Sequence, residues 1–262
     1  MKKSRRAFIV AGLLASASFI GIGCRSESVR PQSPQTLRVL TYNIHHGEGT
    51  DKQFDYERLA NVIKNLKPDI VALQEVDRGT ERASGVDQAK LLARLCHMHY
   101  AFGQAMPHQG GQYGDAILSR FPITKTVVHP LPYQLDLEPR AAVEVEIQPA
   151  GLGPISFVDT HLCHKSQELR IQQTQRLSQL FPSEKGNPVI LAGDFNSRPG
   201  SDPMNVLLNA GWIDAVSPHS VIDYVLVRRC DPWEVKDITI IEEPVVSDHS
   251  PVLVVLQWRN GN

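Results

Sequence analysis

Several short apolar runs in this chain end directly on a polar residue, and this pattern constrains the fold more than any other feature. Residues 70–73 run into Glu75, and residues 189–192 run into Asp194. Short runs rich in Val, Ile and Leu are typical of buried β-strands. Because strand ends hold their side chains rigidly, we expect these polar residues to gather in a catalytic cluster at the edge of a sheet.

Helices alternate with some of these strands. Leu59, Val62, Ile63 and Leu66 have helical spacing and precede Pro68, which predicts a helix over residues 55–67. Similar patterns predict helices over residues 86–98 and 166–180. Strands are predicted over residues 37–42, 70–73, 116–119, 142–147, 155–160, 189–192, 223–227, 235–241 and 252–257. This mixed order predicts the α/β (α+β) class, with packed sheets covered by helices.

The first 35 residues differ from the rest of the chain. Residues 1–24 combine a cationic start, an uncharged apolar run and Cys24, which is typical of an export signal. The stretch SRRAFI at residues 4–9 resembles the twin-arginine signal. Cys24 resembles the lipidated cysteine of bacterial lipoproteins, with an uncleaved apolar anchor as the alternative. We expect a polar linker over residues 25–35 and one folded domain over residues 36–259.

The charge balance argues against tight non-specific binding to nucleic acid. Without residues 1–24, the chain carries 23 basic residues against 28 acidic ones, and no basic patch is evident. Nucleic acid is therefore a possible but not a favoured substrate, and phosphate contacts should be local or assisted by a metal. Cys96, Cys163 and Cys230 lack zinc-site spacing, so we expect buried thiols and at most one disulfide.

An ordered set of motifs carries a family resemblance that extends from Leu37 to Gln257. The motifs in order are TYNIHHG, LQEVD, YGDAILSRFPI, DTHL, LAGDFN, IDYVLV and SDHSPV. Together they resemble those of the endonuclease/exonuclease/phosphatase superfamily, which includes deoxyribonuclease I, in an exported bacterial form. The resemblance implies a four-layer αββα sandwich, in which helices flank two packed mixed β-sheets and the active site lies at one edge.

The resemblance also implies a metal site. Glu75 would be the principal ligand of a divalent cation, Mg²⁺ in the first place and Mn²⁺ or another ion as the alternative. Asn43 would lie near the metal and the phosphate, and Asp248 would be a second acidic contact. Mg²⁺ prefers hard oxygen ligands and keeps several waters, so one or two carboxylates and a substrate phosphate are sufficient.

Five residues receive catalytic roles from the same resemblance. Asp194 would orient or deprotonate the attacking water, and Asn196 would donate to phosphoryl oxygens. Asp223 would hold His249 in one tautomer, and His161 would donate to the phosphate or assist the leaving group. The identity of the base stays open between His249, paired with Asp223, and Asp194.

The substrate side of the site involves residues from other motifs. Tyr113 and Arg140 would bind substrate, with a solvated arginine at a strand start as the alternative for Arg140. His45 and His46 follow Asn43 and would either line the cleft or face solvent.

These inferences predict an exported, metal-dependent phosphoesterase of the nuclease or phosphodiesterase type. It would hydrolyse phosphodiester or phosphomonoester bonds by in-line attack of water. A phospholipid or GPI-like head-group phosphodiesterase is the second candidate, and a catalytically silent binding protein on the same scaffold is the third. We expect a monomer in the periplasm or at the cell surface, with a membrane tether through Cys24 as an option.

Overall fold

The computed structural model of the protein describes residues 35–182 and 186–259. The predicted export signal, residues 1–24, lies outside the described residues, as does the predicted linker apart from Gln35. No helix within the described part of the chain combines the length and the apolar character needed to cross a membrane.

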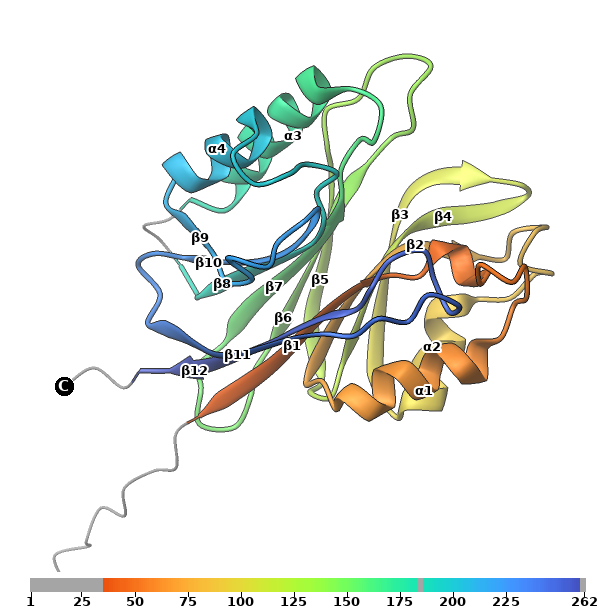
Figure 1. Ribbon diagram of the computed structural model, residues 1–262, viewed down its shortest axis with the longest axis horizontal. Helices are drawn as coiled ribbons and strands as arrows, with labels where there is room; N and C mark the ends of the chain where they lie inside the picture. The colour runs from red at the N-terminus through yellow and green to blue at the C-terminus, as the bar shows by residue number, and fades with distance from the viewer. Residues whose placement is uncertain (1–34, 183–185, 260–262) are drawn as a thin grey trace, which may run out of the picture. The chain divides into compact units, whose positions relative to one another are not determined.

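Two six-stranded sheets form the centre of the fold (Figure 1). The first sheet contains, in spatial order, β11 (Trp233–Ile240), β12 (Val252–Trp258), β1 (Thr36–Asn43), β2 (Ile70–Arg78), β4 (Gly111–Ser119) and β3 (His99–His108). The second contains β5 (Ile123–Pro130), β6 (Ala141–Ile147), β7 (Ile155–His161), β8 (Val189–Asp194), β10 (Asp223–Arg228) and β9 (Trp212–Asp214). In each sheet one central pair is parallel, β1 with β2 and β7 with β8, so both sheets are mixed as predicted.

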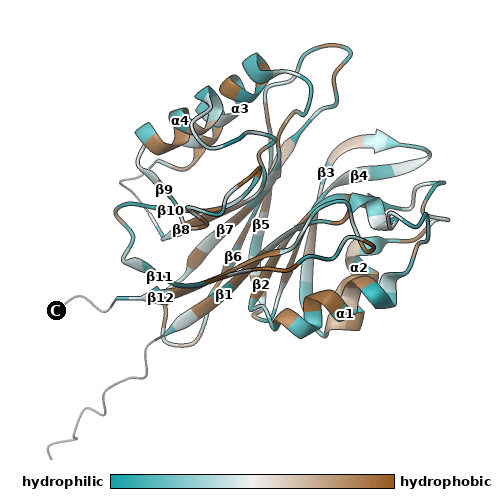
Figure 2. Ribbon diagram, in the orientation of Figure 1, coloured by the Kyte–Doolittle hydropathy of each residue, from teal (hydrophilic) through white to brown (hydrophobic). Residues whose placement is uncertain are grey.

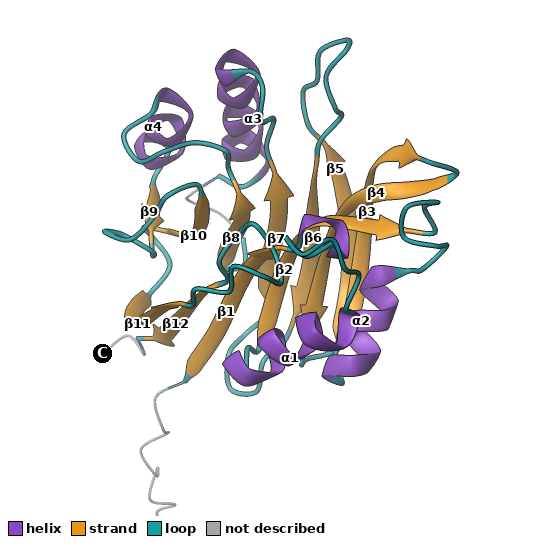
Figure 3. Cartoon of the chain, turned by 45° about the vertical axis from the view of Figure 1, so that its right-hand side comes forward, coloured by secondary structure: helices purple, strands orange, loops and turns teal. Residues whose placement is uncertain are grey.

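Helices cover the outer face of each sheet (Figure 3). The helices α1 (Tyr56–Leu66) and α2 (Gln88–Cys96) pack against the first sheet, and α3 (Gln167–Leu180) and α4 (Asp202–Asn209) pack against the second. Helix α1 begins where the Asp55 side chain accepts a hydrogen bond from the Arg58 amide, and it ends at Lys67, before Pro68. The predicted four-layer αββα sandwich is confirmed.

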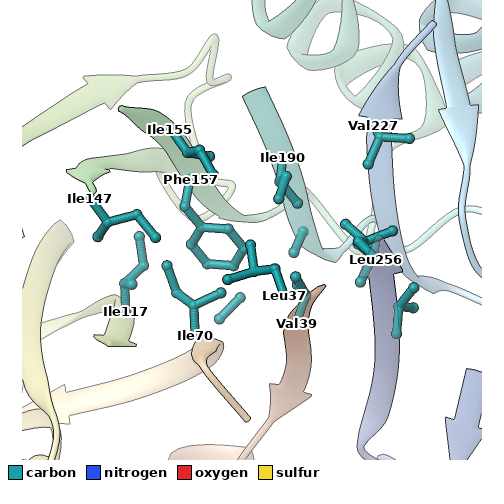
Figure 4. Close-up of a cluster of buried hydrophobic side chains, with 14 of the residues drawn as sticks. Leu37, Val39, Ile70, Ile117, Ile147, Ile155, Phe157, Ile190, Val227 and Leu256 are labelled. Atoms are coloured by element: carbon teal, nitrogen blue, oxygen red, sulfur yellow. The ribbon is translucent and has the colours of Figure 1, made fainter. Parts of the chain in front are cut away.

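The largest apolar cluster lies between the two sheets (Figure 4). On β1, Leu37 and Val39 belong to this cluster, whereas Leu40 and Tyr42 belong to the cluster under α1 and α2. This division follows from the strand repeat of two, which points successive side chains to opposite faces. Figure 2 shows the resulting pattern, with apolar residues along the central strands and mixed colouring on the helices.

The face of each central strand that fills the core changes from apolar to polar toward one end of the sandwich. Following the same repeat, Leu37 and Val39 are succeeded by Asn43, and Ile155 and Phe157 are succeeded by His161. The carboxyl ends of β1, β2, β7 and β8 and the amino end of β10 share this end. The core between the sheets therefore leads directly into a polar cluster.

Four elements carry no clear sequence signal, among them β9, whose three residues are too few to show alternation. The strands β3 and β5 lie at sheet edges, where many side chains and one row of backbone groups face solvent. Apolar and polar residues therefore alternate only weakly along these strands, and few of their residues are buried. The eight-residue helix α4 buries only Pro203, Met204 and Leu207, too few positions to show helical spacing.

The three cysteines in the described residues carry thiols and form no disulfide with one another. Cys163 is buried and Cys96 is half-buried, but Cys230 is exposed. The prediction of a buried thiol is therefore wrong for Cys230, because this residue lies in the turn after β10 and not within the strand.

Gly193 is required where β8 passes β7. Its φ is 145°, and a Cβ atom there would overlap the backbone oxygen of its strand partner Thr160. We expect Gly193→Ala to lower the free energy of unfolding by about 2–4 kcal/mol, because backbone must move to relieve the overlap. Urea unfolding measures this loss. The matched control Gly153→Ala, where an added Cβ meets nothing within 4 Å, should change stability by less than about 0.5 kcal/mol; equal effects would contradict the explanation.

Candidate active site

A polar pocket of about 320 Å³ opens at the end of the sandwich where the core strands become polar. Its walls come from both sheets and from the loops that follow them. The lining residues are His45, His46, Glu75, Arg82, Met106, His108, Tyr113, Glu138, Arg140, His161, His164, Asp194, Asn196, Asp248 and His249.

Strand register brings three of the predicted residues together in the second sheet. Asp194 at the end of β8 pairs with His161 at the end of β7 and with Asp223 at the start of β10. Across the core, Asn43 at the end of β1 donates from Nδ2 to Asp194 Oδ2 at 3.2 Å and to Glu75 Oε1 at 3.1 Å. One amide therefore joins the carboxylates of the two sheets.

Glu75 and Asn196 both lie on left-handed backbone. The φ of Glu75 is 59°, at a bulge where the pairing of β2 with β4 shifts between Leu73 and Val76. A bulge re-aims the side chain that it carries, so Glu75 departs from the strict alternation of β2. The φ of Asn196 is 48°. Left-handed conformations in residues other than glycine are costly, and they concentrate at functional sites.

His249 is held between two carboxylates. Its Nδ1 lies 3.0 Å from Asp223 Oδ2, and its Nε2 lies 3.7 Å from Asp194 Oδ2. Burial favours the neutral ring, but the hydrogen bond to Asp223 and the nearby carboxylates raise the pKa of His249 to about 9. Burial and then the charge of Asp223 raise the pKa of Asp194 to about 7. Because a carboxylate only accepts, Asp223 fixes the proton on Nδ1.

Arg140 fixes the other imidazole of the cluster. Its Nη1 lies 3.0 Å from His161 Nδ1, and a guanidinium only donates, so Nδ1 must be the acceptor. Burial and the charge of Arg140 hold the pKa of His161 well below its ordinary value. The neutral ring therefore carries its proton on Nε2, which lies 3.5 Å from Asp194 Oδ2. Arg140 is 4% exposed and also contacts Glu138, so it is not the solvated arginine of the alternative prediction.

A second layer of buried polar groups supports the pocket from below. Gln74 donates from Nε2 to Asp159 Oδ1 at 2.7 Å and is also hydrogen-bonded to the Thr41 hydroxyl. Burial and the nearby Asp115 carboxylate raise the pKa of Asp159 well above its usual range. Such a layer, filled from both sheets, holds the strand ends in place beneath the reacting groups.

The surroundings of Glu75 fit a divalent cation. Burial opposes the charged form, but the neighbouring imidazoles, that of His46 foremost, and the Asn43 amide hold the pKa of Glu75 below its usual range. Its Oε1 accepts from Asn43, whereas Oε2 has only the His46 ring nearby, at 3.6 Å. A charged carboxylate with an oxygen directed to a pocket is the kind of ligand that hard cations prefer.

A second group also has metal-like spacing. Ligand atoms of Asp194, Asp223 and His249 all lie within 4.8 Å of one another. Two of these residues already satisfy each other, because His249 Nδ1 is hydrogen-bonded to Asp223. A cation bound by all three would have to compete with that hydrogen bond.

Eight of the ten residues predicted for the site line the pocket; Asn43 and Asp223 do not. Asn43 is 1% exposed and lies beneath the pocket, with its Oδ1 accepting from the His45 amide. Both ends of the amide are therefore engaged, and the position of Asn43 near a metal and a phosphate stays a prediction. Asp223 lines an adjacent cavity, which shares Asp248 and His249 with the pocket.

Three other predicted residues take positions that their motifs do not specify. Asp248 lines the pocket but is exposed, as expected for a rim residue. Asn196 donates from Nδ2 to the Leu162 carbonyl at 3.0 Å, so one of its two amide protons is already used. Tyr113 is 6% exposed and carries the guanidinium of Arg82 over its ring at 5.4 Å.

Several lining residues were not predicted, among them Arg82, His108, Glu138 and His164. Arg82 is held by two hydrogen bonds from its guanidinium to the buried Asp77. These residues come from loops and hairpin ends, where no periodic signal marks which side chains face inward. For His45 and His46 the structure favours the first of the two predicted alternatives, because both line the pocket.

Comparison with known proteins agrees with this architecture. Residues 40–249 match the sequence profile described as the Endonuclease/Exonuclease/phosphatase family. The inositol phosphosphingolipids phospholipase C of Saccharomyces cerevisiae is 29% identical over 196 residues, which are 65% of this chain and 39% of the yeast protein. The protein YbhP of Escherichia coli is 27% identical over 170 residues, covering 62% of this chain and 67% of YbhP.

A solved structure gives the same result. The endonuclease/exonuclease/phosphatase of Beutenbergia cavernae superimposes with a TM-score of 0.70 at 25% identity, covering 85% of this chain and 72% of that chain. Fold and site together define a hydrolase of the phosphoesterase type, built on an αββα sandwich. The chain belongs to the endonuclease/exonuclease/phosphatase family, whose members are metal-dependent hydrolases of phosphoester bonds.

Proposed function

We propose that this protein is a Mg²⁺-dependent phosphodiesterase that acts on compact substrates by direct attack of water. The observation that carries the proposal is that Asn43 donates hydrogen bonds to both Glu75 and Asp194 across the two sheets. A cation held by Glu75 would then lie beside the groups proposed to flank the water. Glu75 would hold the cation, because its Oε1 already accepts from Asn43 while its Oε2 lies 3.6 Å from the unpartnered His46 Nδ1. A cation at Asp223 Oδ2 would have to displace the hydrogen bond with His249.

The chain's own residues would divide the remaining work. Asp194 Oδ2 and His249 Nε2, 3.7 Å apart, would flank the attacking water. Asp194 would receive its proton, because the raised pKa of His249 keeps that ring charged and leaves it no free nitrogen at neutral pH. Asp223 would hold the His249 ring, and the Nε2 proton of His161 would be donated to a phosphoryl or leaving oxygen. The bound cation would neutralise charge on a phosphoryl oxygen and on the leaving group.

The pocket supports a small head group better than a long polyanion. Both arginines of its lining are already paired, Arg82 with Asp77 and Arg140 with Glu138. Neither is an unpaired cation of the kind that neutralises a polyphosphate backbone. A nuclease activity would therefore act on short or single-stranded nucleic acid. The substrate would be a phosphate ester of a single head group or nucleotide in the pocket of about 320 Å³.

A lipid head-group phosphodiester is the second candidate. It is supported by the similarity to the yeast phospholipase C, of which this chain spans 39%. It also agrees with the proposal that residues 1–24 direct export to the periplasm or cell surface, where acylated Cys24 would place the enzyme beside lipid. Mutation of Cys24 to Ser would then release the protein from membranes.

The proposed function is tested with the full chain and a panel of phosphate esters. We expect Mg²⁺-dependent hydrolysis of bis(p-nitrophenyl) phosphate to exceed that of p-nitrophenyl phosphate, and EDTA to abolish it until Mg²⁺ is restored. Sphingomyelin, phosphatidylinositol, single-stranded DNA, RNA and plasmid DNA would then rank the substrate classes. Absence of turnover for every ester by the metal-loaded protein would refute the proposal and favour a catalytically silent scaffold.

A further inference from the structure

His46 directs a nitrogen with no hydrogen-bonding partner toward Glu75. The His46 Nδ1 atom is buried, and it lies 3.6 Å from Glu75 Oε2, which is longer than a hydrogen bond. A buried polar atom left without a partner is costly, and it calls for an explanation such as a bound ion.

The opposite nitrogen of the ring shows which form His46 takes. His46 Nε2 lies 3.2 Å from Glu48 Oε2, and because a carboxylate only accepts, Nε2 carries the proton. When a cation takes the place of any proton on Nδ1, the Nδ1 lone pair and Glu75 Oε2 both face the ion. A carboxylate on the far nitrogen of an imidazole is the usual support of a metal-binding histidine, since it fixes the tautomer and raises the basicity of the ligand atom.

The backbone holds this ring in place before anything binds. His46 has a φ of 45° in the short 3₁₀ turn η1 (His45–Gly47), and its carbonyl accepts from Gln88 Nε2 at 2.6 Å. Gln88 is fully buried in helix α2. The next residue, Gly47, has a φ of 81°, and a Cβ atom there would lie 2.8 Å from the Tyr56 ring. A left-handed histidine fixed in this way has lost most of the freedom that ligand binding would otherwise remove.

The separation of the two atoms suits ligands of one ion. Nitrogen and oxygen ligands of small divalent cations lie about 2.1 Å from the metal, so adjacent ligands are roughly 3–3.5 Å apart. The observed 3.6 Å therefore needs little movement. We propose that His46 Nδ1 and Glu75 together bind the divalent cation, so that Mn²⁺ and Co²⁺, which accept nitrogen ligands more readily, bind this site more tightly than Mg²⁺, while Mg²⁺ still supports hydrolysis. This inference rests on the proposed function, which places the cation at Glu75.

Pulsed electron paramagnetic resonance of the Mn²⁺-loaded full chain tests it directly. We expect a histidine nitrogen coupling to the bound Mn²⁺, which changes when the protein is labelled with ¹⁵N-histidine. The coupling should be lost in His46→Asn, a substitution that tolerates left-handed φ. The matched control is His108→Gln, a histidine of the same pocket outside this cluster, in which the coupling should persist.

Calorimetric titration of the same variants measures the ion preference. His46→Asn should weaken Mn²⁺ binding by about tenfold or more and Mg²⁺ binding by less than about threefold, because Mg²⁺ gains little from nitrogen. Glu48→Gln should weaken Mn²⁺ binding by about tenfold through the ring that it orients. Since an asparagine oxygen can itself bind a metal, His46→Phe is the second variant, and it should show the same loss.

The outcomes separate this inference from the proposed function. One outcome is that wild type binds Mn²⁺ without a histidine coupling and that Glu75→Gln abolishes the binding. His46 would then not be a ligand, but the proposed cation position at Glu75 would stand. An unchanged Mn²⁺-to-Mg²⁺ preference in both His46 variants would overturn the inference in the same way. If Glu75→Gln leaves Mn²⁺ affinity unchanged, the proposed position of the cation fails as well. Should the His46 variants not fold, the absence of any histidine coupling in the isotope-labelled wild type would still overturn the inference.

Discussion

Substitution of Asp194 by Asn should lower kcat by about a thousandfold, close to 4 kcal/mol in activation free energy. The Asp194 carboxylate accepts hydrogen bonds from the Asn43 side-chain amide and from the Asn196 backbone amide. It also lies within 4 Å of both the His161 and the His249 rings. An amide of the same shape can neither accept the proton of the water nor balance the charge of these imidazoles. Steady-state kinetics on bis(p-nitrophenyl) phosphate at saturating Mg²⁺ would measure the loss, with KM expected to change much less.

A stability measurement distinguishes catalysis from folding in this variant. Burial and the Asp223 carboxylate destabilise the charged form of Asp194, and removing this charge offsets the loss of one hydrogen bond, because an amide nitrogen cannot accept from Asn43 or from the Asn196 amide. Asp194→Asn should therefore stay folded, with a melting temperature within about 5 °C of wild type. Asp202→Asn, at an exposed acid in the first turn of α4, is the matched control and should keep wild-type kcat. Activity of Asp194→Asn within tenfold of wild type would contradict the role assigned to this residue.

Glu75→Gln should cost at least as much activity, because it removes the charge that would hold the cation. Gln preserves the shape of the side chain and can accept the Asn43 hydrogen bond through its oxygen. Without the cation, the reaction loses the neutralisation of phosphoryl and leaving-group charge, so we expect a loss of about a thousandfold or more in kcat. Titration of activity with Mg²⁺ should also show that saturation is no longer reached.

Direct cation titration completes this prediction. Calorimetry should detect Mg²⁺ binding to wild type and to the control Glu144→Gln, but not to Glu75→Gln. Glu144 is an acid on β6 that pairs with His129 of β5. If Glu75→Gln bound and used Mg²⁺ like wild type, the cation site would instead be assigned to the group of Asp194, Asp223 and His249.

Most of the fold was predictable because buried strands and amphipathic helices leave periodic signals. The central strands of both sheets and the helices α1, α2 and α3 lie where alternation or helical spacing predicted them, with ends shifted by a few residues. The edge strands β3, β5 and β9 and the helix α4 were not predicted, because these elements bury too few side chains to impose a period. The layered arrangement itself was implied by the order of the motifs.

The site was predictable in its membership but not in its contacts. Glu75, His161 and Asp194 were identified because each follows an apolar strand in a family motif. Nothing in a motif indicates that Arg140 is buried against His161 and so fixes its tautomer, because Arg140 immediately precedes β6 whereas His161 ends the neighbouring strand β7. Likewise, the pairing of His46 with Glu75 depends on the bulge in β2 and on the left-handed turn η1.

By itself, the sequence determined which strands are buried and which polar residues end them, because both follow from local periodicity. Only the tertiary structure decided that Asn43 lies beneath the pocket and joins Glu75 to Asp194, a residue 151 positions away. That contact exists because two sheets pack face to face with their polar strand ends aligned. The distance between side chains on different sheets is set by packing across the whole core, which no local pattern encodes.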